Sequence, residues 1–382
     1  MKKKVLVSSF ILFTLLSLVG FYVIGGFVNY KKHQDIKINL VNHPEFIPSS
    51  KVIKGASAGY YNIISDFYWL SAIQYIGSNA IGSEYKKYLY LMLNLITDLN
   101  PNFTYPYQIG ELLLSNYNER YESDGLTKQN TYDKQALELG LKGIKLTCDS
   151  KKIELIKKEF DLPKLWEPNS KYANPCTDSN IPYFLAYIYY WNFHDGVKAS
   201  EYYKITSANT DAPTGARIMA AIMQGKGGDR EKSILMFLSL AESLGTENTK
   251  ECRDFSTYLG GILNKGFQNN VSLNGEFLKG IEIYRKALED KSGGSKEETV
   301  DKGTDCVRYL NKAVREINLA YLEKIDKKYF TDKGKHAFSA KVLFEDKYID
   351  YFPIDYQWTK DFPLNYFYDK DSGHWDNKVE DY

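Results

Sequence analysis

The sequence has few of the residues that build catalytic and metal sites. Its 382 residues include only four cysteines and five histidines, and seven of its 49 basic residues are arginine. Arginine is the preferred side chain for bidentate recognition of phosphates and carboxylates, so its scarcity argues against a dedicated anion site. The net charge of +1 also lacks the basic excess of a nucleic-acid binder. We therefore expect no nucleic-acid partner and no cofactor.

Catalytic sequence signatures are missing as well. The sequence has no Cys-x-x-Cys, no His-Glu-x-x-His, no Gly-x-Ser-x-Gly and no phosphate-binding glycine pattern. Asp369, Asp371 and Gly373 follow one another as in the opening of a calcium loop, but the glycine comes one place early. We interpret this segment as a turn rich in Asp, Ser and Gly. The sequence thus predicts no metal site and no small-molecule substrate.

A long apolar run near the N-terminus is the first strong positive signal. Residues 5–28 carry no charge and follow three lysines. At about 1.5 Å per residue they reach about 36 Å, more than the hydrocarbon core of about 30 Å. A cleaved signal peptide is the alternative, although its apolar part spans only about 7–15 residues. We predict a single-pass anchor in the cytoplasmic membrane, a cytoplasmic stub at residues 1–4 and an extracytoplasmic main domain. The orientation is weakly specified, because three lysines also follow the run, Lys31, Lys32 and Lys37.

All four cysteines follow this run, at Cys148, Cys176, Cys252 and Cys306. Four cysteines allow three connectivities. Pairing of sequence neighbours would close loops of about 28 and 54 residues, each worth about 3–4 kcal/mol in the chain-entropy model. The alternative is four buried free thiols.

Amphipathic segments separated by short breaks follow from residue 61, after a polar connector at residues 29–60. The pattern predicts helices over 63–77, 85–99, 107–115, 134–146, 216–224, 251–263, 275–289 and 305–325, with a helix pair within 180–213. Polar insertions are expected at 116–131 and 149–177. His194 to Gly196 and Gly225 to Gly228 are interpreted as turns, and Asp229 as a helix N-cap.

Small and aromatic residues recur four positions apart in these segments, as Ala199 with Tyr203, Ser233 with Phe237 and Gly280 with Tyr284. A small residue allows two helices to pass closely, and an aromatic one turn later fills the space beside it. Helix-ending prolines stand at Pro101 and Pro213. Over residues 61–290 this pattern resembles the tetratricopeptide repeat. The segments at 66–75 and 98–103 resemble a subgroup of membrane-anchored bacterial repeat proteins of poorly defined function.

The resemblance implies an all-α, right-handed solenoid of helical hairpins over residues 61–300. Such an array needs an atypical terminal element to cover its last open face. We assign that role to residues 301–382, a helix followed by a small, mixed, acidic and aromatic cap with a hairpin near residues 365–375.

A helical array usually binds partners along the groove lined by the first helix of each pair. The helix period predicts six groove residues, which are Tyr107, Glu111, Phe184, Ile188, Trp191 and Asn192. The alternative is that these aromatics pack between repeats, as we expect for most of the 32 tyrosines, including Tyr183, Tyr187, Tyr190, Tyr203 and Tyr284.

The favoured hypothesis is a non-enzymatic scaffold that binds protein or peptide partners at the cell envelope. A second hypothesis is an envelope enzyme using Asp355, Asp361 and Asp369. A third is a surface- or carbohydrate-binding module that exposes Trp358 and Trp375.

Overall fold

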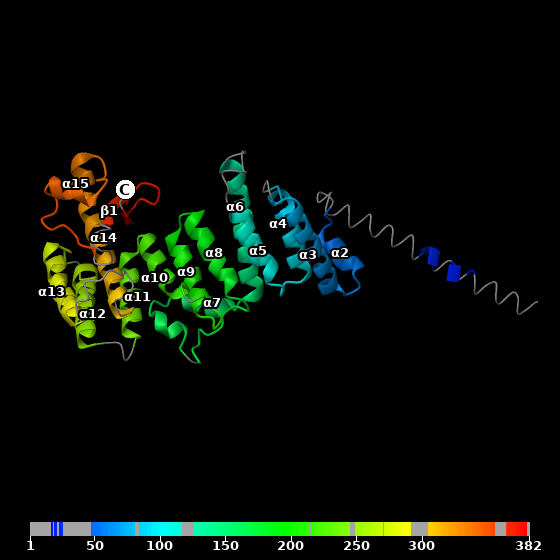
Figure 1. Ribbon diagram of the computed structural model, residues 1–382, viewed down its shortest axis with the longest axis horizontal. Helices are drawn as coiled ribbons and strands as arrows, with labels where there is room; N and C mark the ends of the chain where they lie inside the picture. The colour runs from blue at the N-terminus through cyan, green and yellow to red at the C-terminus, as the bar shows by residue number, and fades with distance from the viewer. Residues whose placement is uncertain are drawn as a thin grey trace, which may run out of the picture. The chain divides into compact units, whose positions relative to one another are not determined.

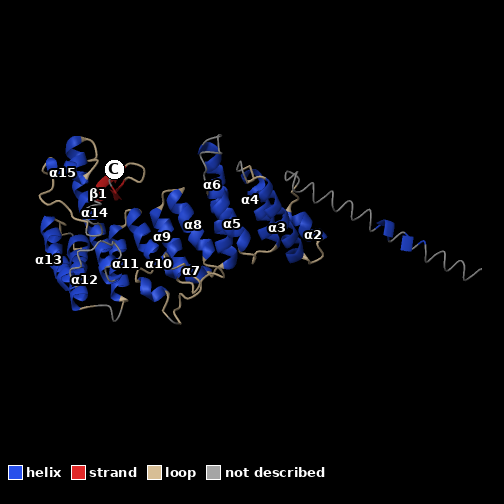
Figure 2. Ribbon diagram, in the orientation of Figure 1, coloured by secondary structure: helices blue, strands red, loops and turns tan. Residues whose placement is uncertain are grey.

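The computed structural model describes most of the chain after residue 46. The described residues are 17, 19–20, 23–25, 47–80, 84–116, 126–167, 169–213, 215–244, 249–269, 271–291, 305–355 and 364–379. They are mostly helical, with a single short hairpin among them (Figure 2). The chain divides into two compact units, residues 1–135 and 136–382. The prediction of an all-α protein with a small mixed C-terminal part is confirmed.

The predicted anchor at residues 5–28 lies almost wholly outside the described residues. In the part of the chain that is described, no helix is both long and apolar enough to cross a bilayer. The anchor therefore remains a prediction from the sequence.

The described part of the first unit is built of helices. Their bounds are α2 Ser50–Ala56, α3 Tyr61–Ser78, α4 Lys86–Leu99 and α5 Tyr105–Ser115, followed by α6 Leu126–Thr147, which contains the unit boundary. α3 packs on α4, and α4 packs on α5. Leu89, Leu93 and Ile96 are fully buried on one side of α4, as expected from apolar residues at spacings of four and three. The Ser65 hydroxyl on α3 donates to the Ile96 carbonyl at 3.1 Å, which ties the pair together.

After α6, the second unit continues with helices α7 Ser150–Lys157, η2 Leu162–Leu165, α8 Asn180–Trp191, α9 Gly196–Ser207, α10 Ala216–Lys226 and α11 Arg230–Glu242. Four of them, α8 to α11, pack side by side in chain order, while α7 packs on α9 and η2 on α9 and α11 (Figure 1). α8 packs on α9, α9 on α10, and α10 on α11. The predicted small and aromatic pairs lie in these contacts, since Ala199, Tyr203, Ser233 and Phe237 are all buried. Asp195 and Asp229 cap α9 and α11 by accepting hydrogen bonds from backbone amides, so the predicted N-cap at Asp229 is confirmed.

The rest of the second unit folds around one long helix. The bounds are α12 Lys250–Ile262, η4 Leu263–Gln268, α13 Gly275–Lys291, α14 Asp305–Lys333, α15 Ala340–Glu345, β1 Leu364–Asp369 and β2 His374–Val379. α14 packs along α11 and also contacts α12 and β2. β1 and β2 pair antiparallel from Leu364 opposite Val379 to Asp369 opposite His374. The predicted C-terminal hairpin is confirmed.

Two predicted boundaries are wrong. α14 continues to Lys333 rather than ending near residue 325, and α6 starts at Leu126 inside the expected polar insertion. The insertion at 149–177 also contains α7 and η2. These segments are rich in polar residues, and tertiary contacts such as those of α7 with α9 stabilise their helices.

Both pairs of sequence-neighbouring cysteines are joined. Cys148 is bonded to Cys176 across 28 residues, and Cys252 to Cys306 across 54. The first bond connects the end of α6 to the segment before α8, and the second connects α12 to α14. All four cysteines are used in these bonds.

Candidate functional site

One exposed aromatic surface of the second unit lies on α8, where two large rings share one side of the helix. The inner side of α8 consists of Ile181, Leu185 and Ile188, which are fully buried. Tyr187 and Trp191 lie one turn apart on the outer side, with 47% and 59% of their surface exposed. Their ring centroids are 6.0 Å apart. Trp and Tyr are enriched at protein interfaces and among binding hot spots, because each offers a broad apolar surface with a polar end.

Neighbouring rings hold this surface in place. Tyr190 meets Trp191 edge to face, with centroids 5.0 Å apart. Tyr183 meets Phe184 in the same way at 5.7 Å, and it also meets Tyr203 of α9 at 5.5 Å. Burial raises the pKa of Tyr203 well above its ordinary value. We call Phe184, Tyr187, Tyr190 and Trp191 the α8 aromatic face.

A cation lies at the edge of the α8 aromatic face. The Lys226 ammonium, at the end of α10, lies 5.9 Å from the Tyr190 ring centroid and pairs with the Asp376 carboxylate of β2. Burial alone would lower the pKa of Lys226, but Asp376 outweighs it and the pKa is raised. Lys226 therefore stays charged and links the aromatic face to the C-terminal hairpin.

The six predicted groove residues differ in how far they are exposed. Tyr107, Glu111 and Ile188 have no exposed surface, so the expectation that they line a groove is wrong. Phe184 and Asn192 are half-buried, and Trp191 is exposed. Tyr107 and Glu111 belong to the first unit and the other four to the second. The helix period gives the spacing of one face, but it does not say which face a neighbouring helix covers.

Tyr187 is more exposed than its predicted role in packing allows. It was expected to pack between helices, and almost half of its surface is exposed. Its spacing of four from Trp191 was the available signal, because residues four apart share one side of a helix.

The C-terminal hairpin is fixed by a buried ionic network. Arg230 of α11 donates to Glu316 at 2.9 Å and to Glu323 at 3.0 Å, both on α14, and also to the Trp375 carbonyl on β2. The Arg230 side chain is only 3% exposed. The His374 ring nitrogen Nδ1 lies 3.9 Å from Glu323. The network therefore joins three elements that are remote in sequence.

The alternatives that rely on the acidic tail find little support in the described residues. Asp355 is buried and bonded to Arg315 through Nε at 2.6 Å and Nη2 at 3.1 Å. Asp369 accepts the backbone amides of Asp371 and Ser372 in the hairpin turn. Burial opposes ionisation of Asp369, but its Ser372 contacts prevail and lower its pKa. Asp361 lies outside the described residues, and among those that are described no three His, Cys, Asp or Glu side chains could hold a metal.

The surface-module hypothesis is weakened by Trp375, which is only 1% exposed rather than available to a ligand. The fold explains this, since β2 lies against α14 and its Trp375 carbonyl accepts from Arg230. Trp358 lies outside the described residues.

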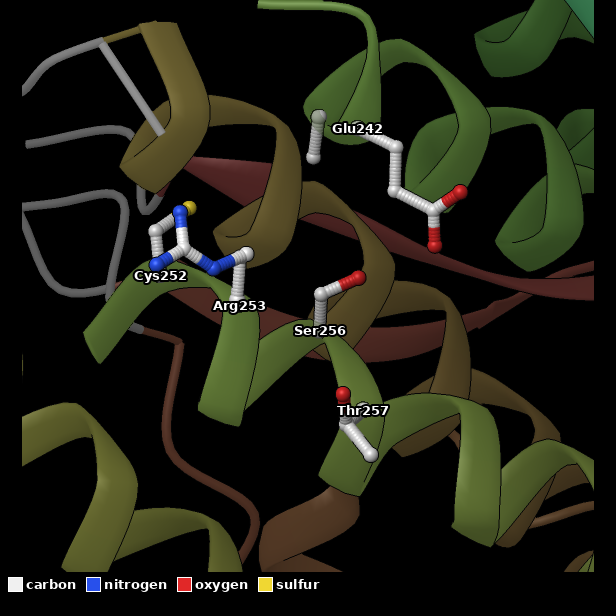
Figure 3. Close-up of a pocket in the computed structure, with 6 residues that line it drawn as sticks. Glu242, Cys252, Arg253, Ser256 and Thr257 are labelled. Carbon is white, nitrogen blue, oxygen red and sulfur yellow. The ribbon is translucent and has the colours of Figure 1, made fainter. Parts of the chain in front are cut away.

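A small pocket of about 200 Å³ opens between α11 and α12. Figure 3 shows Arg253, Ser256 and Thr257 on one helix and Glu242 on its neighbour. The disulfide-bonded Cys252 and Ala241 complete the lining. The volume is below the roughly 300–1,000 Å³ of typical ligand sites. The α8 aromatic face is therefore the stronger candidate site.

Comparison of the chain with protein-family models, with curated proteins and with solved structures gives no match in any of the three. Fold and site together define a helical protein with an exposed aromatic helix face.

Proposed function

We propose that the protein is a non-enzymatic scaffold, anchored in the cytoplasmic membrane by residues 5–28, that binds protein or peptide partners at the cell envelope. The observation that carries the proposal is the exposure of Trp191 and Tyr187 on one side of α8. Exposed Trp and Tyr anchors with a charged rim are the usual composition of a protein-binding hot spot. Lys226 supplies a charge at the edge.

The proposal includes a right-handed, tetratricopeptide-like solenoid as the scaffold. Its support is the sequential packing of α8, α9, α10 and α11 with buried Ala199 and Tyr203 where two of these helices pass. The extracytoplasmic location is supported by the two disulfides, because such bonds persist in oxidising compartments.

The test is quantitative affinity capture from envelope fractions with the full-length chain. We expect Tyr187→Ser together with Trp191→Ser to lose the proteins that the wild type enriches. The matched control is Phe338→Ser with Phe344→Ser, which removes two aromatics that are 71% and 46% exposed elsewhere in the same unit. Equal capture by both double variants and the wild type would reject the α8 aromatic face as the binding surface.

A further inference from the structure

The first unit exposes an apolar stripe along α3. Ile63, Phe67 and Leu70 lie at spacings of four and three, and they are 53%, 56% and 56% exposed. This spacing places all three on one side of the helix. Contiguous apolar surface of this kind on a soluble unit usually marks an interaction site. We call these three side chains the α3 stripe.

Packing within the unit explains why the α3 stripe faces outward. The opposite side of α3 carries the buried residues Ser65, Ala72 and Tyr75, and α3 packs on α4. α3 therefore packs on the unit through its buried side and still exposes aliphatic and aromatic groups to solvent on the other side. Its one charged residue, Asp66, is exposed beside the stripe.

The chain before α3 indicates what covers the stripe. Residues 29–60, which connect the apolar run to α3, contain five lysines and two acidic residues. A juxtamembrane excess of lysine is attracted to anionic lipid headgroups. The 18 residues from 29 to 46 span at most about 63 Å when fully extended. A membrane anchor at residues 5–28 would therefore hold residue 47, where the described part of the first unit begins, within that distance of the bilayer. Tyr60 and Tyr61, 66% and 38% exposed at the start of α3, are residues that prefer the headgroup region.

We propose that the α3 stripe docks the first unit onto the surface of an anionic lipid bilayer. Ile63, Phe67 and Leu70 enter the boundary between headgroups and acyl chains, while the exposed Lys51 and Lys54 of α2 contact the headgroups. This inference rests on the membrane anchor proposed above. It adds that the first unit lies on the membrane rather than extending freely from it.

The test uses the full chain reconstituted into vesicles of phosphatidylcholine and phosphatidylglycerol. Because all four native cysteines are in disulfides, Phe67→Cys adds one thiol for a fluorescent probe. The matched control is Leu112→Cys, at an aliphatic position of α5 that is 41% exposed in the same unit. We expect acyl-chain quenchers to reduce the emission at position 67 several-fold more than at position 112. Adding Ile63→Glu and Leu70→Glu should remove this quenching while the chain stays with the vesicles and keeps its helical circular dichroism.

Three outcomes would overturn the proposal. Equal quenching at positions 67 and 112 in vesicle-bound chain would reject docking and leave the anchor standing. Disulfide crosslinking between chains at position 67, without lipid quenching, would show that a second copy covers the stripe. A chain that does not float with the vesicles at all would reject the anchor as well.

Discussion

Arg230 of α11 and Glu316 of α14 form a buried ion pair, with Nη1 2.9 Å from Oε2 and side chains that are 3% and 8% exposed. The two residues are 86 positions apart in the chain, so the pair joins two helices that are distant in sequence. Through Glu323 and the Trp375 carbonyl, Arg230 also fixes the hairpin against α14. This contact makes the C-terminal cap part of the second unit's core.

Replacing Arg230 by Met should lower the free energy of unfolding by about 3–5 kcal/mol, because it leaves a buried carboxylate without its cation. Urea unfolding followed by circular dichroism measures the change. Adding Glu316→Leu should recover part of the loss, since both charges are then removed. Lys250→Ala breaks an exposed pair with Asp254 and should leave the stability nearly unchanged. A loss no larger for Arg230→Met than for Lys250→Ala would contradict the role of the network.

Lys204 should make stability depend on pH in the alkaline range. Its ammonium is buried and donates to the carbonyls of Lys157 and Glu159 at 2.6 and 3.0 Å, near the end of α7. Burial lowers its pKa from 10.5 to about 8. Between these values the unfolded chain binds more protons than the folded chain, so stability rises with pH.

As the pH rises from about 8 to 10.5, Lys204 should add on the order of 3 kcal/mol to the free energy of unfolding, from the size of its pKa shift. Urea midpoints measured from neutral pH upward should rise less steeply for Lys204→Met than for the wild type. Wild type and variant have to be compared because Lys312 should contribute a similar rise in both, since burial also lowers its pKa to about 8. Parallel midpoint curves for variant and wild type would rule out the contribution of Lys204.

Gly196 and Gly227 mark a place where α9 and α10 leave no room for a side chain. A Cβ at Gly196 would lie 2.5 Å from the Gly227 backbone nitrogen and 2.6 Å from the Met223 carbonyl oxygen. Gly196→Ala should therefore destabilise the protein by about 1–3 kcal/mol. Gly260→Ala in α12, where no atom lies within 4 Å of the added Cβ, should instead stabilise it by about 0.5–1 kcal/mol. Thermal unfolding of both variants gives the comparison, and equal shifts would refute the close approach.

The disulfide between Cys148 and Cys176 should contribute about 3–4 kcal/mol by restricting the unfolded chain. Replacing both by Ser should lower the urea midpoint by a corresponding amount. Reduction of the double variant should then lower the midpoint further only by the contribution of the remaining Cys252–Cys306 bond. An unchanged midpoint in the double variant would show that the first bond does not stabilise the fold.

Sequence patterns predicted the helices well where apolar spacing and capping residues agreed. Asp229 before α11 is one case. The Asp-rich turn between the strands β1 and β2 was also predicted, from its turn-forming residues. Sequence patterns did not predict which side of a helix is covered, as Tyr107 and Tyr187 show. Burial is set by contacts between elements distant in sequence, and no local period contains that information. The Arg230 network was missed for the same reason, since its members come from three separate elements.

The central claim is that the α8 aromatic face binds a protein partner at the envelope. Photocrosslinking in intact envelopes tests it most directly, with p-benzoylphenylalanine in place of Trp191 and, as a control, in place of Phe344, which is 46% exposed in the same unit. We predict a discrete crosslinked protein at position 191 that is absent at position 344 and is lost when Tyr187→Ser is added. Identical crosslinking at both positions, or none at position 191, would contradict the claim.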